Sequence, residues 1–226
     1  MSDLFANENS SNALETPLAD KMRPQSLDEV IGQKHLFGDE GPLQNMIISG
    51  VFSSIILWGP PGVGKTTIAR LLADNSDSHF EQLSAIFTGV GDLKKVFEAS
   101  KIRRTNGRRT IIFVDEIHRF NKSQQDSFLP FLEDGTITLI GATTENPSFE
   151  LNPAILSRVQ VLVLERLNNT DLLQLLERAE SVLGSQINLE IDAKTELLKI
   201  ADGDGRTLLN LIENINSWEI SNPLTV

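Results

Sequence analysis

The chain contains no cysteine among its 226 residues. A disulfide framework and a zinc site built on thiolates are therefore excluded. The sequence also has no uninterrupted apolar run of about 18 residues, the length that a membrane-spanning helix needs. Its start has no basic region followed by an apolar core, so it does not resemble a secretion signal. These absences predict a cytoplasmic protein that has no membrane partner.

A net positive charge is absent as well, because the formal charge is −11 at pH 7. A surface that attracts nucleic acid everywhere is therefore excluded. Residues 94–109 depart from this balance, with seven of the chain's 20 basic residues and the single acid Glu98. This basic segment can bind the phosphate backbone of DNA or form an ordinary solvated helix face, and the sequence leaves both open. The candidate DNA contacts are Lys94, Lys95, Arg103, Arg104, Arg108 and Arg109.

A glycine-rich stretch after a short apolar run is the most informative part of the sequence. Gly59, Gly64, Lys65 and Thr66 fit the phosphate-loop pattern of glycine, four residues, glycine, lysine and Ser or Thr. Glycines let successive backbone N–H groups face the phosphates of a nucleotide, and a helix that begins near Lys65 adds its positive dipole end. We predict that Lys65 reaches the β- and γ-phosphates of ATP and that the Thr66 hydroxyl binds Mg²⁺. The predicted nucleotide contacts are Gly59, Pro60, Pro61, Gly62, Val63, Gly64, Lys65, Thr66 and Thr67.

Two acidic residues, Asp115 and Glu116, follow four consecutive apolar residues at 111–114. Such a run predicts a strand that is buried on both faces. We expect Asp115 to bind Mg²⁺ and Glu116 to polarise the attacking water. An acid pair at a strand end is common by itself, but this one lies 50 residues after Lys65 in an alternating αβ pattern.

Short apolar segments alternate with helical patterns through most of the chain, which predicts an α/β fold. The predicted strands are 55–58, 80–84, 110–116, 136–142 and 159–164, and the predicted helices include 65–74, 92–103 and 117–133, the last interrupted at Pro130. We expect a five-stranded parallel sheet flanked by helices, with ligands at the carboxyl ends of the strands.

The pattern changes near residue 168, where leucines begin to recur at helical spacing. Turns at Gly184 and Gly203 separate three predicted helices. The predicted division is a flexible polar tail at 1–16, an ATPase core at 17–167 and a small α-helical lid at 168–226.

Several longer stretches resemble a known family. The phosphate loop, the Asp115-Glu116 pair and the helical lid resemble the AAA+ ATPases of the clamp-loader branch. More narrowly, the stretches MRPQSLDEVIGQKHL, FVDEIHRFNKSQQD and DGTITLIGATTENPSFELNPAILSR resemble the bacterial replication-associated recombination protein A family, which is related to the Werner-helicase-interacting ATPase. That family continues beyond the lid into helical regions that support a tetramer. The resemblance therefore implies that this chain is a fragment.

The resemblance also implies roles for single residues. Thr144, with Thr143 as the alternative, resembles the residue that contacts the γ-phosphate or the attacking water. Arg158 resembles the arginine finger that enters the site of a neighbouring subunit, although a surface arginine at a helix end is the ordinary alternative. Arg206 resembles the lid arginine that contacts the γ-phosphate.

Five other residues have weaker assignments. Arg23, Ile31 and Gly32 lie where this family brackets the adenine. Ser84 lies where related ATPases carry a polar residue that holds the catalytic glutamate inactive until DNA binds. His118, two residues after Glu116, is expected to support that site rather than to bind a metal.

These features predict a DNA-dependent ATPase that uses ATP and Mg²⁺ to remodel or load factors at stalled or single-stranded replication intermediates. The partners implied by the resemblance are DNA ends, forks or single strands, replication factors such as single-strand binding protein, and further copies of the chain. A location at the nucleoid follows from the DNA partner. Two alternatives stay open: a nucleotide-gated scaffold with little turnover, and a small-molecule kinase that shares only the phosphate loop.

Overall fold

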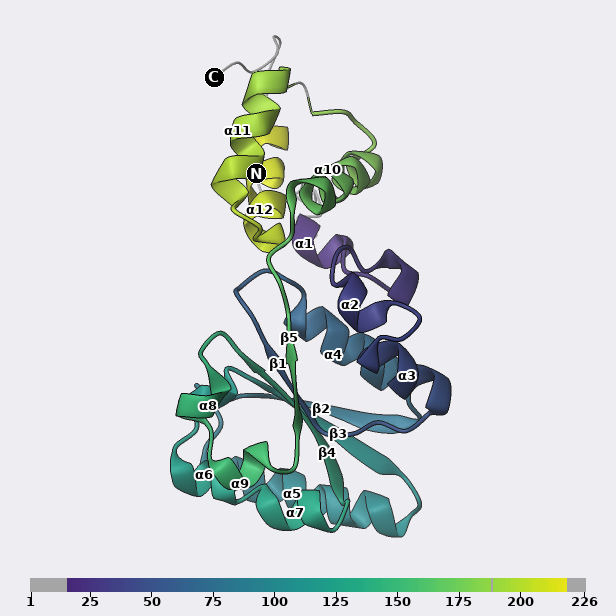
Figure 1. Cartoon of the computed structure of the whole chain (residues 1–226), viewed down its shortest axis with the longest axis vertical. Helices are drawn as coiled ribbons and strands as arrows, with labels where there is room; N and C mark the ends of the chain where they lie inside the picture. The colour runs from purple at the N-terminus through teal and green to yellow at the C-terminus, as the bar shows by residue number, and fades with distance from the viewer. Residues whose placement is uncertain (1–15, 188, 219–226) are drawn as a thin grey trace, which may run out of the picture.

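Five parallel strands form the central layer of the protein (Figure 1). The computed structural model describes residues 16–187 and 189–218. The strands are β1 (Ile55–Trp58), β2 (Ser78–Ser84), β3 (Arg109–Asp115), β4 (Ile137–Thr143) and β5 (Gln160–Val163). Their order in the sheet is β2-β3-β4-β1-β5, and every neighbouring pair is parallel. The predicted five-stranded parallel sheet is therefore confirmed.

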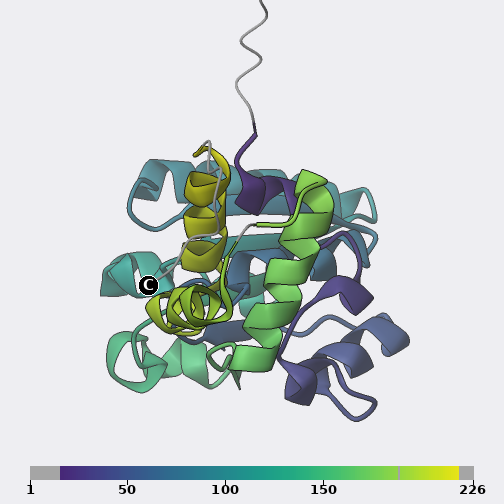
Figure 2. The ribbon, with the colours of Figure 1, turned by 90° about the horizontal axis from the view of Figure 1, so that it is seen from above.

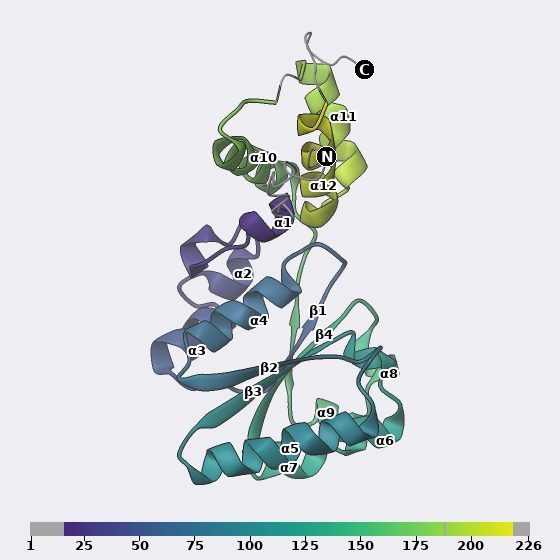
Figure 3. The same cartoon turned by 180° about the vertical axis from the view of Figure 1, so that it is seen from behind.

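Both faces of the sheet are covered, which explains the unbroken apolar runs in its strands. In β3, Ile111 and Phe113 belong to one core cluster, whereas Ile112 and Val114 belong to the other. The helices α3 (Pro42–Ser49) and α4 (Lys65–Asp74) cover the first face, and α5 (Val90–Thr105) covers the second (Figure 3).

The segment 117–133, predicted as a helix interrupted at Pro130, folds as three short pieces. They are the 3-10 turn η2 (Ile117–Arg119), α6 (Lys122–Asp126) and α7 (Leu129–Glu133). The prediction was wrong about the break, because Pro130 lies in the first turn of α7. A proline is tolerated there, since the N–H that it lacks would have no partner within the helix.

The other short elements surround these layers. They are α1 (Leu18–Lys21), the 3-10 turn η1 (Leu27–Glu29), α2 (Lys34–Phe37), α8 (Pro147–Glu150) and α9 (Pro153–Leu156). No helix of the described residues is both long and apolar enough to cross a membrane.

A separate helical cluster lies beyond the carboxyl ends of the strands (Figure 1). It contains α10 (Asn169–Leu183), α11 (Ile191–Ala201) and α12 (Gly205–Asn216). Leu18 and Met22, from the start of the predicted core, pack into this cluster, and the Leu18 N–H donates a hydrogen bond of 2.9 Å to Glu213. Figure 2 shows α1 beside α10 and α12. The first helix of the described residues therefore joins the helices that were predicted to form the lid.

The two ends of the sequence limit how far the predicted division can be followed. The predicted tail, apart from Thr16, and the last eight residues of the predicted lid lie outside the described residues.

Candidate nucleotide-binding site

A cavity of about 570 Å³ lies between the sheet and the helical cluster. Its walls include residues 61–67 of the phosphate loop and of the first turn of α4. Asp115, Glu116 and Thr144 reach it from the strand ends, and Arg206 reaches it from α12. Ligand pockets for small molecules have volumes of roughly 300–1,000 Å³, so the space suits a nucleotide.

The phosphate loop has the backbone that anion binding needs. Gly62 has a φ of 70° and Gly64 a φ of 97°, in the left-handed region that side chains disfavour. Gly64 precedes the first residue of α4, and it provides no side chain to cap that helix. The first N–H groups of α4 are therefore available, together with the positive end of the helix dipole, for a phosphate.

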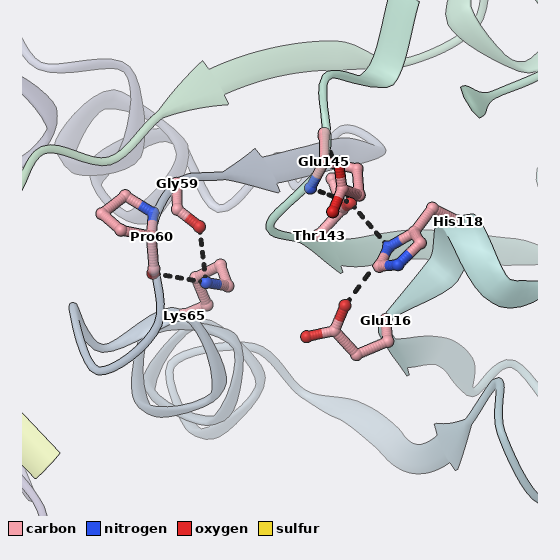
Figure 4. A network of polar contacts seen from close by, with 7 residues as sticks. All are labelled: Gly59, Pro60, Lys65, Glu116, His118, Thr143 and Glu145. Carbon is pink, nitrogen blue, oxygen red and sulfur yellow. Dashed lines mark hydrogen bonds and ion pairs between the residues drawn. The ribbon is translucent and has the colours of Figure 1, made fainter. Parts of the chain in front are cut away.

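Lys65 is buried, with 8% of its surface exposed. Its Nζ donates hydrogen bonds to the carbonyl oxygens of Gly59 at 2.8 Å and Pro60 at 2.7 Å (Figure 4). Gly59 and Pro60 were predicted to contact the nucleotide, but they do not line the cavity and instead hold the lysine. Burial lowers the pKa of Lys65, while the carboxylates of Glu116 and Asp115 act in the opposite direction.

The acidic pair lies where β3 ends. Asp115 is the last residue of the strand, and Glu116 adopts a left-handed conformation with φ 53° and ψ 47°. Such a conformation costs a non-glycine residue about 1–3 kcal/mol and is most often found at functional sites. The turn places Glu116 on the cavity wall together with Asp115.

A magnesium ion would find oxygen ligands in this wall. Thr66 and Asp115 both line the cavity. The described residues contain no cluster of three or more His, Cys, Asp or Glu side chains that could hold a metal alone. This fits Mg²⁺, which is usually bound by one or two protein oxygens together with nucleotide phosphates and water.

The two adjacent threonines at the end of β4 have different surroundings. Thr144 lines the cavity. Thr143 is fully buried, and its Oγ1 makes hydrogen bonds with His118 Nδ1 and with the backbone of Glu145. Of the two candidates for the γ-phosphate contact, only Thr144 therefore has access to the space where a phosphate would lie.

The helical cluster touches the phosphate loop directly, next to Arg206. The Gly205 N–H donates a hydrogen bond of 3.2 Å to the Gly62 carbonyl, and Asp204 caps α12 by accepting from the Thr207 N–H at 2.9 Å. A Cβ on Gly62 would lie 1.7 Å from Asp204 Oδ1. Only glycine leaves room for α12 to begin at this point.

Arg158 lies outside the cavity, before the first residue of β5. Because the phosphate loop follows the last residue of the neighbouring strand β1, the two lie at opposite ends of the sheet. The Arg158 guanidinium donates to Glu133 on α7 at 2.5 Å and to the Ala154 carbonyl at 2.7 Å. It cannot serve the nucleotide cavity of its own chain.

The three predicted adenine contacts separate into two groups. Arg23 and Ile31 line the cavity, but Gly32 does not. The structure gives Gly32 a packing role, because a Cβ there would lie 2.8 Å from Leu167 Cδ2 at a φ of +75°. Gly32 allows the chain to pass close to Leu167, at the point where the helical cluster begins.

The sequence did not indicate the remaining walls of the cavity. Arg178 on α10 donates to the Glu29 carbonyl at 3.0 Å and to the Glu29 carboxylate at 2.5 Å, and both residues line the cavity. Asn210 also lines it, one helical turn after Arg206, a spacing that could have indicated a shared face. The other walls not predicted include Pro17, Asp20, Met22, Leu175 and Leu209.

The basic segment is largely paired with acids of the same chain. Lys95 pairs with Asp92 at 3.5 Å, Lys101 with Glu98 at 2.9 Å, Arg103 with Glu81 at 3.6 Å and Arg104 with Asp134 at 3.3 Å. Among the described residues, no ion pair involves Lys94, Arg108 or Arg109. Any attraction for DNA would therefore depend mainly on these three.

Known proteins resemble this chain both in sequence and in structure. Residues 55–167 match the ATPase family associated with various cellular activities (AAA). The chain is 50% identical over 209 residues to replication-associated recombination protein A of Coxiella burnetii, covering 90% of this chain and 47% of that protein. It is 43% identical over 201 residues to ATPase WRNIP1 of Dictyostelium discoideum, covering 87% of this chain and 23% of that protein.

A solved structure, the RuvB Holliday junction branch migration motor of Thermotoga maritima, is similar with a TM-score of 0.70 and 30% identity, covering 85% of this chain and 64% of that chain. The chain spans about half the length of the curated bacterial relatives that it matches. The family resemblance inferred from the motifs is confirmed.

Proposed function

Because the chain belongs to the AAA family of ATPases, we propose that it hydrolyses Mg·ATP in a DNA-dependent reaction and thereby remodels or loads factors at stalled or single-stranded replication intermediates. The observation that carries this proposal is the single cavity where the phosphate loop, the Asp115-Glu116 pair, Thr144 and Arg206 meet. The names of the relatives, which refer to replication, recombination and branch migration, support the DNA context.

The proposed roles follow from the position of each side chain. Lys65 would turn from the loop carbonyls to the β- and γ-phosphates, and Thr66 and Asp115 would hold Mg²⁺, which would supply charge neutralisation. Glu116 orients and polarises the attacking water. Thr144 and Arg206 donate to the oxygens on which negative charge grows, and fixed donors of this kind each contribute roughly 10²–10³ in rate.

Arg158 completes the site of a neighbouring copy in this proposal. Its position at the far end of the sheet supports action in trans, and an arginine finger can contribute about 10³–10⁵ in rate. The proposed assembly resembles a tetramer, and its other partners are DNA ends, forks or single strands and replication factors such as single-strand binding protein. The cytoplasmic, nucleoid-associated location belongs to the same proposal. Mass determination in solution with and without Mg·ATP tests the assembly.

Steady-state ATP turnover, measured with and without single-stranded DNA or DNA ends, tests the enzymatic claim. We expect DNA to stimulate turnover, and Glu116→Gln to bind ATP normally while losing roughly 10²–10⁴-fold in rate. The exposed Glu40→Gln is the matched control and should behave like the wild type. Absence of hydrolysis under all conditions, or hydrolysis unaffected by Glu116→Gln, would exclude the proposal.

Charge reversal tests the DNA contact separately. The triple variant Lys94→Glu, Arg108→Glu and Arg109→Glu is expected to weaken DNA binding and to flatten its salt dependence by about one unit per lost phosphate contact. Reversal of Lys34, Lys194 and Lys199, which lie outside the basic segment, is the control. If both triple variants change DNA affinity and its salt dependence equally, the basic segment is an ordinary solvated helix face and not a DNA contact.

The nucleotide-gated scaffold remains the second candidate, and one observation favours it. Arg158 is held by Glu133 and Ala154 of its own chain, so a copy without a neighbour lacks one part of the catalytic site. DNA or protein binding that responds to ATP in the Glu116→Gln variant, with full biological activity, would favour the scaffold over the enzyme.

A further inference from the structure

One buried histidine connects the two strand ends that face the nucleotide cavity. His118 has 6% of its side chain exposed, and its Nδ1 lies 3.2 Å from Glu116 Oε2 and 2.9 Å from Thr143 Oγ1. Figure 4 shows the three side chains in a continuous series, from Glu116 through His118 to Thr143. His118 itself does not line the cavity. It is therefore placed to act on the cavity only through its neighbours.

The hydrogen bonds of Thr143 decide which atoms carry the protons. A threonine hydroxyl has one hydrogen and can accept two hydrogen bonds. Thr143 Oγ1 accepts from the Glu145 N–H at 3.0 Å and lies 3.2 Å from the Glu145 carbonyl oxygen, which can only accept. If the hydroxyl donates to that carbonyl, its remaining position is an acceptor, and His118 Nδ1 must be the donor.

The carboxylate of Glu116 leads to the same assignment. An Nδ1 without hydrogen would be an acceptor 3.2 Å from a carboxylate oxygen, and two acceptors at this distance repel each other. A protonated Nδ1 donates to Thr143 Oγ1 and carries its hydrogen on the ring edge that lies 3.2 Å from Glu116 Oε2. This holds for the neutral ring and for the imidazolium, since both can carry a hydrogen on Nδ1. Burial strengthens the contact because little water competes for it.

We propose that His118 is a positioning residue. Its Nδ1–H donates to Thr143, the neighbour of Thr144, and the same edge of the ring holds the carboxylate of Glu116 in place by an electrostatic contact. The sequence analysis expected Ser84 to hold Glu116 inactive until DNA binds, which is a different task, and in the structure the carboxylate of Glu116 pairs with His118. Glu116 protrudes from a left-handed turn and is 30% exposed on its side chain, so its direction needs a second point of support. The catalytic consequence rests on the proposed ATP hydrolysis, but the contact itself does not.

Nitrogen-15 NMR of the imidazole rings tests the contact without any turnover. The chain has three histidines, and His118→Asn and His79→Asn identify which signals belong to which ring. We expect His118 to carry hydrogen on Nδ1 and its nitrogen frequency to shift in Glu116→Gln, while the signals of His79 stay in place. A neutral His118 ring with hydrogen on Nε2 only would overturn the proposal.

Turnover tests the consequence with two nearly isosteric changes. Asparagine places an N–H donor at the δ position, whereas glutamine places it one atom farther, near the ε position. We expect His118→Asn to stay within about threefold of the wild-type kcat, and His118→Gln and His118→Leu to lose roughly 10–100-fold with little change in KM. Full activity of His118→Leu, or a loss expressed mainly in KM, would overturn the positioning role.

The two measurements separate this inference from the proposed function. If the wild-type protein hydrolyses no ATP, the proposed function fails, and the NMR experiment alone decides whether His118 holds Glu116. If the wild type hydrolyses ATP and His118→Asn does not rescue the loss seen in His118→Leu, the proposed function stands and the donor role of Nδ1 fails.

Discussion

The nucleotide cavity has two ends that are built in different ways. The strand end consists of the phosphate loop, the Asp115-Glu116 pair and Thr144, which lie at the carboxyl ends of β1, β3 and β4. These strands are neighbours in the sheet, so strand pairing alone brings their carboxyl ends together. The helical end consists of the segment 17–31 together with residues of α10 and α12.

The helical end depends on contacts between distant parts of the chain. Arg178 on α10 donates to Glu29, and Gly205 at the start of α12 donates to Gly62 of the phosphate loop. Part-exposed ion pairs of this kind contribute about 0–1 kcal/mol each, whereas the sheet is fixed by a buried core. We therefore expect the strand end to be the more rigid part of the cavity.

The largest effect is expected from a substitution at the strand end of the cavity. Lys65→Ala removes the only ammonium group that lines the described cavity, and we expect ATP affinity to fall at least ~100-fold, since a buried charge partner is lost. Fluorescence titration with labelled ATP measures this, and Lys34→Ala is the exposed control. A loss below about tenfold would show that the helical end contributes more to binding than its contacts suggest.

An effect of similar or smaller size is expected for Arg206, which the helical end contributes to the cavity wall. Arg206→Ala should lower kcat by roughly 10²-fold and change ATP affinity less, because its guanidinium would serve developing charge. Arg206→Lys keeps the charge and tests whether the planar fork matters. A loss that appears only in KM would make Arg206 a binding group, like the rest of the helical end.

The contact between α10 and the N-terminal segment should matter less. Arg178→Met removes the hydrogen bonds to Glu29, and we expect nucleotide affinity to fall about 2- to 10-fold. Glu29→Gln should have a smaller effect, because the backbone carbonyl of Glu29 still accepts from Arg178 at 3.0 Å. If the loss of binding free energy in the double variant equals the sum of the losses in the two single variants, Arg178 and Glu29 act independently. Their contact then contributes nothing to nucleotide binding.

The smallest expected effect is the uptake of a fraction of one proton when a nucleotide binds. Burial lowers the pKa of Lys65 below its ordinary value of 10.5, and phosphates beside the ammonium would raise it again. Nucleotide binding should therefore take up protons between these two pKa values and none from this group below that window. Calorimetry at about pH 7 and about pH 9 in buffers of different ionisation enthalpy measures the uptake. No increase with pH would show that Lys65 stays fully charged without a nucleotide.

The same contrast explains what the sequence could predict. The strand end is encoded by short motifs, because the pattern around Lys65 and the acids after residues 111–114 each specify a local geometry. β1 and α4 have the predicted bounds, Ile55–Trp58 and Lys65–Asp74. Motifs of this kind can be read without knowing where the rest of the chain lies.

The helical end could not be predicted in this way. Glu29 and Arg178 are 149 residues apart, and no pattern in either segment indicates that they meet. Gly32 looked like a nucleotide contact because its place in the family suggested one, whereas its positive φ and its distance to Leu167 give it a packing role. His118 and Thr143 likewise meet only because β3 and β4 are neighbours.

The position of Arg158 has a consequence for symmetry. Its guanidinium lies at one end of the sheet and the cavity at the other, so a finger that serves a second copy requires two different surfaces to meet. Such a heterologous interface generates a ring when the rotation closes and an open filament when it does not. In a ring, every cavity receives an arginine from a neighbour. In an open array, the terminal copy keeps a cavity that no arginine enters, so closure itself would decide how many of the sites can work.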